Sequence, residues 1–194
     1  MAAWVMRRYP KPWFFAGGWA IDLFLGRRRR WHKDVDLAVF RSDQTQLRLF
    51  LDGRKPRRLA NGEFVHWRLG DSLVSPEFQV FTEPWASFGL DWEFLLEDGN
   101  AERWVFRKDP RIWLPAEQAY LMTPDGVPYL APEIVLLFKA SPSTASSNDS
   151  ATEELGRLND EEDFRDAQSA MGERARAWLA ESVALAYPEP ALSW

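Results

Sequence analysis

The amino-acid sequence predicts a mixed α/β (α+β) domain followed by a helical C-terminal part. Short apolar or alternating runs, separated by Gly, Pro, Asn and Asp, predict strands over the first 131 residues. Longer segments with apolar residues three and four positions apart predict helices after that point. With 46% hydrophobic residues, including 11 Trp and 13 Phe, the 194-residue chain can form a substantial core without disulfide bonds. We expect the mixed α/β core domain at residues 1–131 and the helical region at residues 132–194.

Most predicted elements before residue 132 are short. In chain order they are a strand at 13–16, a helix at 19–25, a strand at 35–40, a helix that follows the potential cap Asp43 and ends at Gly53, and strands at 57–60, 64–69, 78–81, 90–96, 102–107, 119–122 and 127–130. Asn61-Gly62 and Asp125-Gly126 predict hairpin turns between the strands on either side of them, and Asp98-Gly99-Asn100 predicts a third hairpin.

The C-terminal part is predicted to contain three helices and one linker. Pro132 stands in the favourable first-turn position for proline and opens a helix at 133–140. Residues 141–152 are rich in Ser, Ala and Thr and are typical of a flexible linker. Two helices follow at 160–171 and 173–186. Their predicted buried faces carry Phe164, Trp178 and Leu179.

Composition narrows the classes of function. The chain has no Cys and two His, which excludes disulfides and thiolate metal sites and argues against a histidine-rich zinc site. The first nine residues lack the apolar segment and the cleavage site of a signal peptide, and no uncharged apolar stretch reaches the roughly 18 residues needed to span a membrane. The net charge of -5 argues against broad binding to nucleic acid. We therefore expect a soluble cytoplasmic protein with no membrane partner.

Two aspartates one residue apart are the most informative feature of the chain. Asp34 and Asp36 alternate with Val35 and Leu37, so both carboxylates point to the same side of one strand. Adjacent carboxylates repel each other unless a proton or a cation lies between them. Oxygen ligands on a rigid strand suit Mg²⁺, which keeps waters and takes its other ligands from phosphates. The competing interpretation is an exposed strand edge with two solvated carboxylates.

Several residues near this strand suit a nucleoside triphosphate (NTP). Gly17-Gly18 lies at a strand-to-helix turn, where backbone N–H groups can face phosphate oxygens. Arg27 to Arg30 is a basic run that mostly faces solvent, but one member, for which we choose Arg30, can clamp a phosphate with two hydrogen bonds. Lys139 ends an apolar helix and is either a surface lysine or a second phosphate ligand. His32 fits a structural role better than a catalytic one.

Asp91 is the candidate third carboxylate. On the strand predicted at 90–96, Asp91 and Glu93 share one face, and the apolar residues, Trp92 among them, share the other. A neighbouring strand could bring Asp91 beside the paired aspartates, where it could take the proton of an attacking hydroxyl during a Mg²⁺-dependent nucleotidyl transfer. The equally favoured alternative is that Asp91 and Glu93 lie on the solvent-exposed face of a half-buried sheet. Trp85 or Trp92 could stack on a base or a ring.

The segment from Gly17 to Leu37 resembles the signature of the aminoglycoside and lincosamide nucleotidyltransferases, a family within the DNA polymerase beta nucleotidyltransferase superfamily. It is most similar to the aminoglycoside 2''-adenylyltransferase type, whose pattern runs Gly-Gly-Trp-Ala-x-Asp, then Gly-x-x-x-Arg-x-His-x-Asp-x-Asp-Leu. Every fixed position of that pattern is met here at the same spacing. Leu90-Asp91-Trp92-Glu93 resembles the strand that carries the family's third carboxylate, and 124–126 and 131–140 resemble downstream segments of relatives.

The resemblance implies a nucleotidyltransferase-type mixed sheet flanked by helices, with a helical C-terminal region that closes the cleft. It places the triphosphate at Gly17 and Gly18, Mg²⁺ at Asp34 and Asp36, and makes Asp91 a metal ligand or general base. By analogy, Glu93 touches the acceptor. The implied reaction moves a nucleoside monophosphate, AMP from ATP or the equivalent group of another NTP, onto a hydroxyl of a small molecule and releases pyrophosphate. An aminoglycoside- or lincosamide-like acceptor and antibiotic resistance follow from the family name alone.

One element departs from the family pattern. Relatives are expected to have Lys-Asp-x-x-Asp-Phe where the C-terminal helices open, whereas this chain has Asn159-Asp160-Glu161-Glu162-Asp163-Phe164 and lacks the lysine. Two alternatives therefore stand beside the small-molecule enzyme: a toxin-type nucleotidyltransferase that modifies a protein or RNA, and a non-catalytic nucleotide-binding module, which the missing lysine favours. No motif fixes the acceptor, the nucleotide base or the oligomeric state.

Overall fold

The computed structural model describes residues 2–83, 91–141 and 150–188. Its helices are α1 (Ala2–Met6), α2 (Gly17–Phe24), the 3-10 helix η1 (Arg41–Asp43), α3 (Gln44–Phe50), α4 (Ala116–Ala119), α5 (Pro132–Lys139), α6 (Ser150–Ala170) and α7 (Glu173–Ala186). Its strands are β1 (Trp13–Phe15), β2 (Asp34–Phe40), β3 (Arg57–Ala60), β4 (Glu63–His66), β5 (Gln79–Thr82), β6 (Asp91–Glu97), β7 (Arg103–Val105), β8 (Trp113–Pro115), β9 (Tyr120–Met122) and β10 (Pro128–Leu130).

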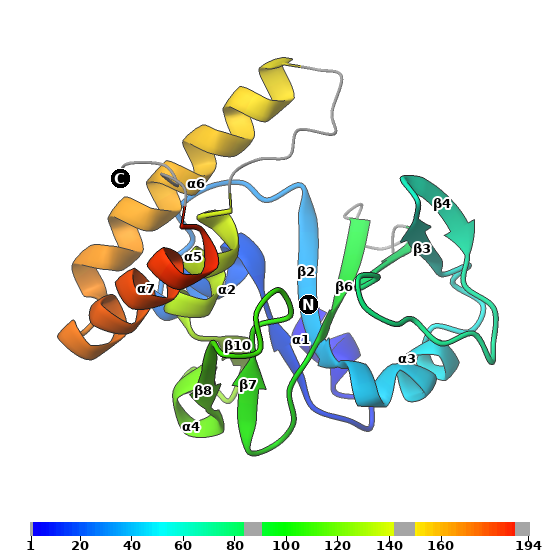
Figure 1. Ribbon diagram of the computed structural model, residues 1–194. Coiled ribbons are helices and arrows are strands. Elements are labelled where there is room, and N and C mark those ends of the chain that lie inside the picture. Colours follow the sequence, from blue (N-terminus) through cyan, green and yellow to red (C-terminus); the bar gives the residue numbers. More distant parts are fainter. Residues whose placement is uncertain (1, 84–90, 142–149, 189–194) are drawn as a thin grey trace.

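An 8-stranded mixed sheet has the order β4-β3-β5-β6-β2-β1-β10-β9. In this sheet β2 is parallel to β6 and β1 is parallel to β10, whereas the other neighbouring pairs are antiparallel. Strands β7 and β8 form a separate 2-stranded sheet. The two strands that carry the predicted carboxylates, β2 and β6, therefore lie side by side in the middle of the large sheet (Figure 1).

The sequence of β2 explains its central position. Val35 and Leu37 are buried, and residues 38–40 are buried in succession, so the end of the strand is covered on both faces. Asp34 and Asp36 are only partly buried and lie in the first half of the strand. The strand is thus anchored by its apolar second half and presents its carboxylates at the other end.

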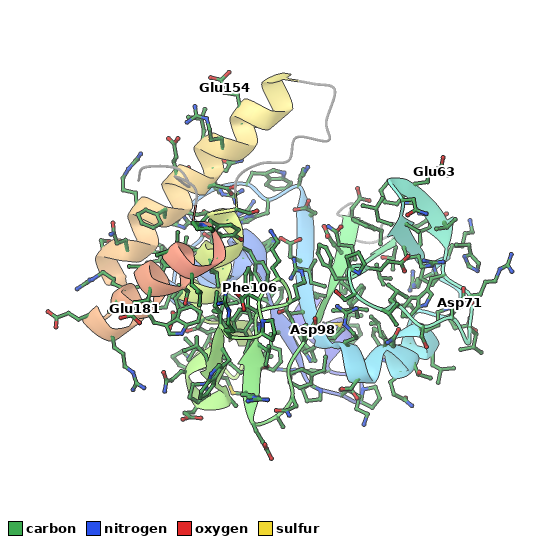
Figure 2. All side chains as sticks on the ribbon, in the orientation of Figure 1. Glu63, Asp71, Asp98, Phe106, Glu154 and Glu181 are labelled. Carbon is green, nitrogen blue, oxygen red and sulfur yellow. The ribbon has the colours of Figure 1, made fainter. Side chains whose placement is uncertain are left out.

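Helices α2, α5, α6 and α7 gather at one side of the molecule, opposite the β3–β4 hairpin (Figure 1). Helix α5 contacts α2, α6 and α7. Figure 2 shows Phe106 between these helices and the strands, where it is fully buried, and Glu154 on the outer part of α6. The helical C-terminal region therefore packs on α2, and α2 in turn contacts β2.

One hydrophobic core joins the sheet and the C-terminal helices. Its largest fully buried side chains include Trp67, Trp92 and Trp104. The helical residues Ala167 and Leu179 belong to the same cluster. The mixed α+β fold with a helical C-terminal region is confirmed, whereas the division of the chain at residue 131 stays a prediction.

The third predicted hairpin is wrong. The strand that follows Asp98-Gly99-Asn100 is β7, which pairs with β8 and not with β6. Both edges of β6 are already occupied, by β2 and by β5, so no ladder position is left for β7. Asn100 instead closes a local turn, in which its side-chain oxygen accepts hydrogen bonds from the backbone N–H groups of Glu102 and Arg103. The hairpins predicted at 61–62 and 125–126 are confirmed.

Two further expectations need correction, and three short elements were not expected. Asp43 makes no capping hydrogen bond, and its carboxylate lies 3.7 Å from Lys11 instead. Helix α6 begins at Ser150, inside the predicted linker, and residues 142–149 and Leu90 lie outside the described residues. Helices α1 and α4 and strand β8 are too short for the sequence periodicity to reveal. No helix in the described ranges has the length and apolar character needed to cross a membrane.

Candidate active site

Four carboxylates share one face of the β2–β6 pair. The parallel register places Asp34 opposite Asp91 and Asp36 opposite Glu93. The alternate residues of both strands, such as Val35 and Trp92, are buried on the other face. The predicted juxtaposition of the Asp34/Asp36 pair with the Asp91 strand is therefore present in the fold.

Gly17 lies directly against the second aspartate. A Cβ at position 17 would collide with Oδ2 of Asp36 and lie 2.9 Å from its Cγ. The backbone of Gly17 has φ +54°, a left-handed conformation that glycine adopts without strain. The N–H of Ala16 also donates to the carbonyl of Asp36 at 3.0 Å. The first residue of α2 can approach the carboxylate this closely only because it has no side chain.

Asp36 is held in an environment that disfavours its negative charge. Burial first, and then the neighbouring charges of Glu93 and Asp34, raise the pKa of its carboxyl to about 7 against the opposing effect of Lys139 and Arg30. Burial also raises the pKa of Glu93, although its carboxylate accepts a 2.6 Å hydrogen bond from Nε2 of Gln79. These partly buried, mutually repelling carboxylates form a donor set that a bound cation would stabilise.

Two of the four carboxylates, Asp36 and Glu93, open onto a cavity of about 350 Å³, whose lining does not include Asp34 or Asp91. Its lining includes Asp36, Glu93, Lys139 and Asp160, from β2, β6, α5 and α6. Gly17 also lines it, so the start of α2 faces the same space. The cavity therefore brings together two of the four carboxylates, the first glycine of the pair and one candidate phosphate ligand, Lys139. Asp91 is exposed at the outer end of β6.

No preformed metal site is complete in the described ranges, since no group of three or more His, Asp or Glu side chains is arranged to hold an ion. Two carboxylates are nevertheless sufficient from the protein when a triphosphate and water supply the remaining oxygen ligands. The residues present, Asp34 and Asp36 with Glu93 beside Asp36 on the same face, fit Mg²⁺ in this sense, because the negative charge of Asp36 is otherwise poorly compensated.

Gly18 packs beneath Arg30 and His32. A Cβ at position 18 would collide with a terminal nitrogen of Arg30 and lie 2.6 Å from Cε1 of His32. His32 is buried, its Nε2 lies 2.7 Å from Oδ2 of Asp22, and its ring lies 4.6 Å from that of Trp19. This enclosure agrees with a structural role for His32, which ties the start of β2 to α2.

Lys139 is not a surface lysine, and that alternative is wrong. Its ammonium forms ion pairs with Asp160 and, at 3.0 Å, with Asp163. Burial alone would lower the pKa of Lys139, but the two carboxylates outweigh it and raise the pKa above its ordinary value. The amine is therefore charged and held at the cavity. The acidic element after Asn159 thus has a lysine partner, which α5 supplies.

A buried ionic network connects these residues. Arg29 donates to Asp22 at 2.8 Å and to Asp163 at 2.6 Å, and Arg30 donates to Asp163 at 3.2 Å. The sequence interpretation missed Asp22, Arg29 and Asp163 as members of the site. Asp160 and Asp163 are spaced to share one helix face, and this spacing could have indicated that they point at a common partner.

Of the two aromatic candidates, the one among the described residues, Trp92, does not line this cavity. Trp92 is 1% exposed and packs near Phe94 in the core, so the expectation that it stacks on a base is wrong. The alternation along β6 that directs Glu93 to the site directs Trp92 away from it. Trp85 lies outside the described residues.

Comparisons with known proteins point to one group of enzymes. Residues 3–55 match the family model described as aminoglycoside-2''-adenylyltransferase. The fold is similar to the crystal structure of ANT(2'')-Ia in complex with adenylyl-2''-tobramycin, with a TM-score of 0.57 and 16% identity over 92% of this chain and 90% of that chain. It is also similar to the solution structure of the antibiotic-resistance factor ANT(2'')-Ia, with a TM-score of 0.53 and 16% identity over 91% and 84% of the two chains.

A third solved structure, the lincomycin-bound lincosamide antibiotic adenylyltransferase LnuA, has a TM-score of 0.49 and 15% identity over 81% of this chain and 90% of that chain. A comparison with the sequences of curated proteins gives no match. The family match covers Gly17, Gly18, Asp34 and Asp36, and the similarity of fold to the ANT(2'')-Ia crystal structure covers 92% of this chain.

Proposed function

For a chain that resembles the aminoglycoside 2''-adenylyltransferases at residues 3–55 and shares their fold, we propose the activity of a nucleotidyltransferase. It moves a nucleoside monophosphate, AMP from ATP, onto a hydroxyl of a small aminoglycoside- or lincosamide-like molecule and releases pyrophosphate. The observation that carries this proposal is the carboxylate face of β2 and β6, against which Gly17 packs and whose Asp36 lies within the electrostatic influence of Lys139 and Arg30.

Asp34 and Asp36 are the proposed ligands of Mg²⁺. When bound, the ion neutralises the triphosphate and aligns it for in-line transfer. The raised pKa of Asp36 supports this assignment, because a carboxylate that is repelled by Glu93 and Asp34 gains most from a nearby cation.

The phosphates are proposed to bind at the start of α2 and at the neighbouring cations. The first N–H groups of a helix have no partner within the helix and can donate to phosphate oxygens, and Gly17 and Gly18 occupy these positions. Arg30 and Lys139 add positive charge on the same side as Asp36. These groups hold the triphosphate so that its α-phosphorus faces the acceptor.

The acceptor side of the reaction is assigned to β6. The acceptor hydroxyl oxygen forms a bond to the α-phosphorus, the bond from that phosphorus to the bridging oxygen breaks, and pyrophosphate leaves. We assign the hydroxyl proton to Asp91, which lies opposite Asp34 in the register, and the acceptor contact to Glu93. The adenylyl-2''-tobramycin bound by the similar structure supports a hydroxylated acceptor.

A transfer assay tests the proposal. The purified protein is incubated with ATP labelled at the α-phosphate, Mg²⁺ and a panel of aminoglycosides and lincosamides, and labelled product and pyrophosphate are measured. A labelled small molecule, absent with Asp34→Asn or Asp36→Asn, supports the proposal. A labelled protein or RNA in cell lysate replaces it with the toxin-type activity, and ATP binding without any pyrophosphate release replaces it with a non-catalytic module.

A further inference from the structure

The acidic face of α6 reaches the proposed phosphate site at two carboxylates, Asp160 and Asp163. They are one helical turn apart, and both pair with Lys139. Figure 1 shows α6 running beside α5 and α2. Helix α5 ends with Lys139, and the segment after α2 contains Arg30, the other candidate phosphate ligand. The two carboxylates differ in burial, because the side chain of Asp163 is 0% exposed and that of Asp160 is 32% exposed.

Asp163 is the centre of three ion pairs. Its carboxylate accepts from Arg29 at 2.6 Å and from Arg30 at 3.2 Å, and it lies 3.0 Å from the ammonium of Lys139. A buried carboxylate that is surrounded by three cations cannot be withdrawn without leaving those charges unpaired. The buried Asp163 carboxylate therefore restricts the positions of the three cationic side chains with which it pairs.

Two of these cations border the carboxylate face. Lys139 lines the same cavity as Asp36 and Glu93. Arg30 packs over Gly18, next to the residue that touches Asp36. Long Lys and Arg side chains have much rotamer freedom when nothing holds them, and binding a ligand to a mobile cation costs the freedom that is lost. A partner that fixes both side chains in advance removes this cost.

We propose that Asp163 is a positioning residue of the phosphate site, whose buried carboxylate holds Arg30 and Lys139 where the phosphates of the nucleotide bind. This inference rests on the proposed function. It gives α6 a role in nucleotide binding although Asp163 itself touches no phosphate.

Asp160 has the opposite effect on phosphate affinity. It lines the cavity and is partly exposed, so its carboxylate lies on the side of Lys139 from which an anion arrives. A phosphate that binds Lys139 there is repelled by Asp160 or displaces it. The same change of charge at two neighbouring positions of one helix is therefore expected to act on affinity in opposite directions.

Calorimetric titration tests this with inorganic pyrophosphate and with a non-hydrolysable ATP analogue, each with Mg²⁺. Asp163→Asn is expected to raise Kd by about tenfold to hundredfold, the loss expected when one or two charge-assisted hydrogen bonds to phosphate weaken. Asp160→Asn is expected to leave Kd unchanged or lower it. Asp166→Asn, which removes only a 3.4 Å contact to Arg29, is the matched control and is expected to bind as wild type does.

The sign of the Asp163→Asn effect is decisive. If the carboxylate merely competed with phosphate, its neutralisation would tighten binding, so an unchanged or lower Kd overturns the inference. If the wild-type protein binds neither pyrophosphate nor the ATP analogue, the proposed function itself is overturned. If the wild type binds and Asp163→Asn binds equally well, only the inference about Asp163 is overturned.

Two further variants separate positioning from a general loss of fold. Asp163→Glu keeps the charge and is expected to fold, yet it moves the carboxylate and is expected to raise Kd several-fold; wild-type affinity in this variant contradicts positioning. In a Lys139→Gln background, Asp163→Asn is expected to add less loss than it causes alone, because part of its effect passes through Lys139. Fully additive losses contradict the inference.

Discussion

Replacing Gly17 with alanine separates the close approach at the carboxylate from ordinary backbone strain. Two costs are expected at this position. The residue has φ +54°, so a side chain there costs about 1–2 kcal/mol of stability. The added methyl would also collide with Oδ2 of Asp36 and lie 2.9 Å from its Cγ, so the carboxylate has to leave its present place.

Gly26→Ala is the matched control for this experiment. Gly26 ends the same helix region with φ +66°, and a Cβ there has no heavy atom within 4 Å. Backbone strain is therefore expected to cost each variant about 1–2 kcal/mol, which for a chain of this length lowers Tm by roughly 2–8 °C, and the collision with Asp36 adds to the loss in Gly17→Ala alone. Only Gly17→Ala is expected to lose Mg²⁺-dependent ATP binding as well, because only its methyl displaces a proposed metal ligand.

The assay combines thermal unfolding with calorimetric titration of a non-hydrolysable ATP analogue and Mg²⁺. We expect Gly17→Ala to bind at least about tenfold more weakly than Gly26→Ala at a temperature where both variants are folded, which corresponds to about 1.4 kcal/mol of binding energy. Equal affinities in the two variants would refute the reasoning that Gly17 is required for the position of Asp36.

Three further predictions concern charge and burial. The affinity for Mg²⁺ or Mn²⁺ is expected to rise as pH increases through about 7, because Asp36 loses its proton there. Glu93→Gln removes a negative charge beside Asp36 and is expected to move this transition to lower pH. Calorimetric titrations between pH 6 and 8 that give the same metal affinity at every pH would contradict this prediction. His32→Ala is expected to cost about 1–3 kcal/mol in urea unfolding, since it leaves a buried oxygen of Asp22 without its 2.7 Å partner, and a loss well under 0.5 kcal/mol would argue against the structural role. Burial alone would raise the pKa of Asp163, but Lys139 and the hydrogen bonds from the two arginines hold this pKa below its ordinary value. The ionised carboxylate therefore stabilises the fold at pH values above its pKa in the unfolded chain, and this stabilisation is lost as pH falls through its pKa in the folded protein. Asp163→Asn should therefore flatten the acid limb of the pH–stability profile, and an unchanged limb would count against these ion pairs.

The sequence was most informative where local periodicity and chemistry agree. The alternation of Asp34 and Asp36 with apolar residues predicted β2, and the same period on β6 predicted that Asp91 and Glu93 share a face. Both strands have the expected arrangement, and their parallel register places all four carboxylates on one face. The pairing partner itself depends on the whole sheet order, which no local pattern contains.

The ionic network was not predictable because it joins segments far apart in the chain. Arg29 and Asp163 are separated by 134 positions, and their pairing depends on how α6 packs across α2 and α5. Lys139 looked like a surface lysine because an apolar helix that ends in lysine usually exposes it. Lys139 is enclosed because α6 packs against α5, and Asp160 and Asp163 of α6 form ion pairs with the amine that offset the cost of burying its charge.

The measurement that most directly tests the central claim is thermal unfolding with each NTP, with and without Mg²⁺, on wild type and on Asp34→Asn/Asp36→Asn. At a hundredfold excess over Kd, one NTP is expected to stabilise the wild type by about 2.7 kcal/mol and to raise Tm by roughly 5–10 °C, only when Mg²⁺ is present. The double variant is expected to fold and to show no such rise. Wild-type protein without a shift for any NTP, or an equal shift in the double variant, would contradict a nucleotide site built on these two aspartates.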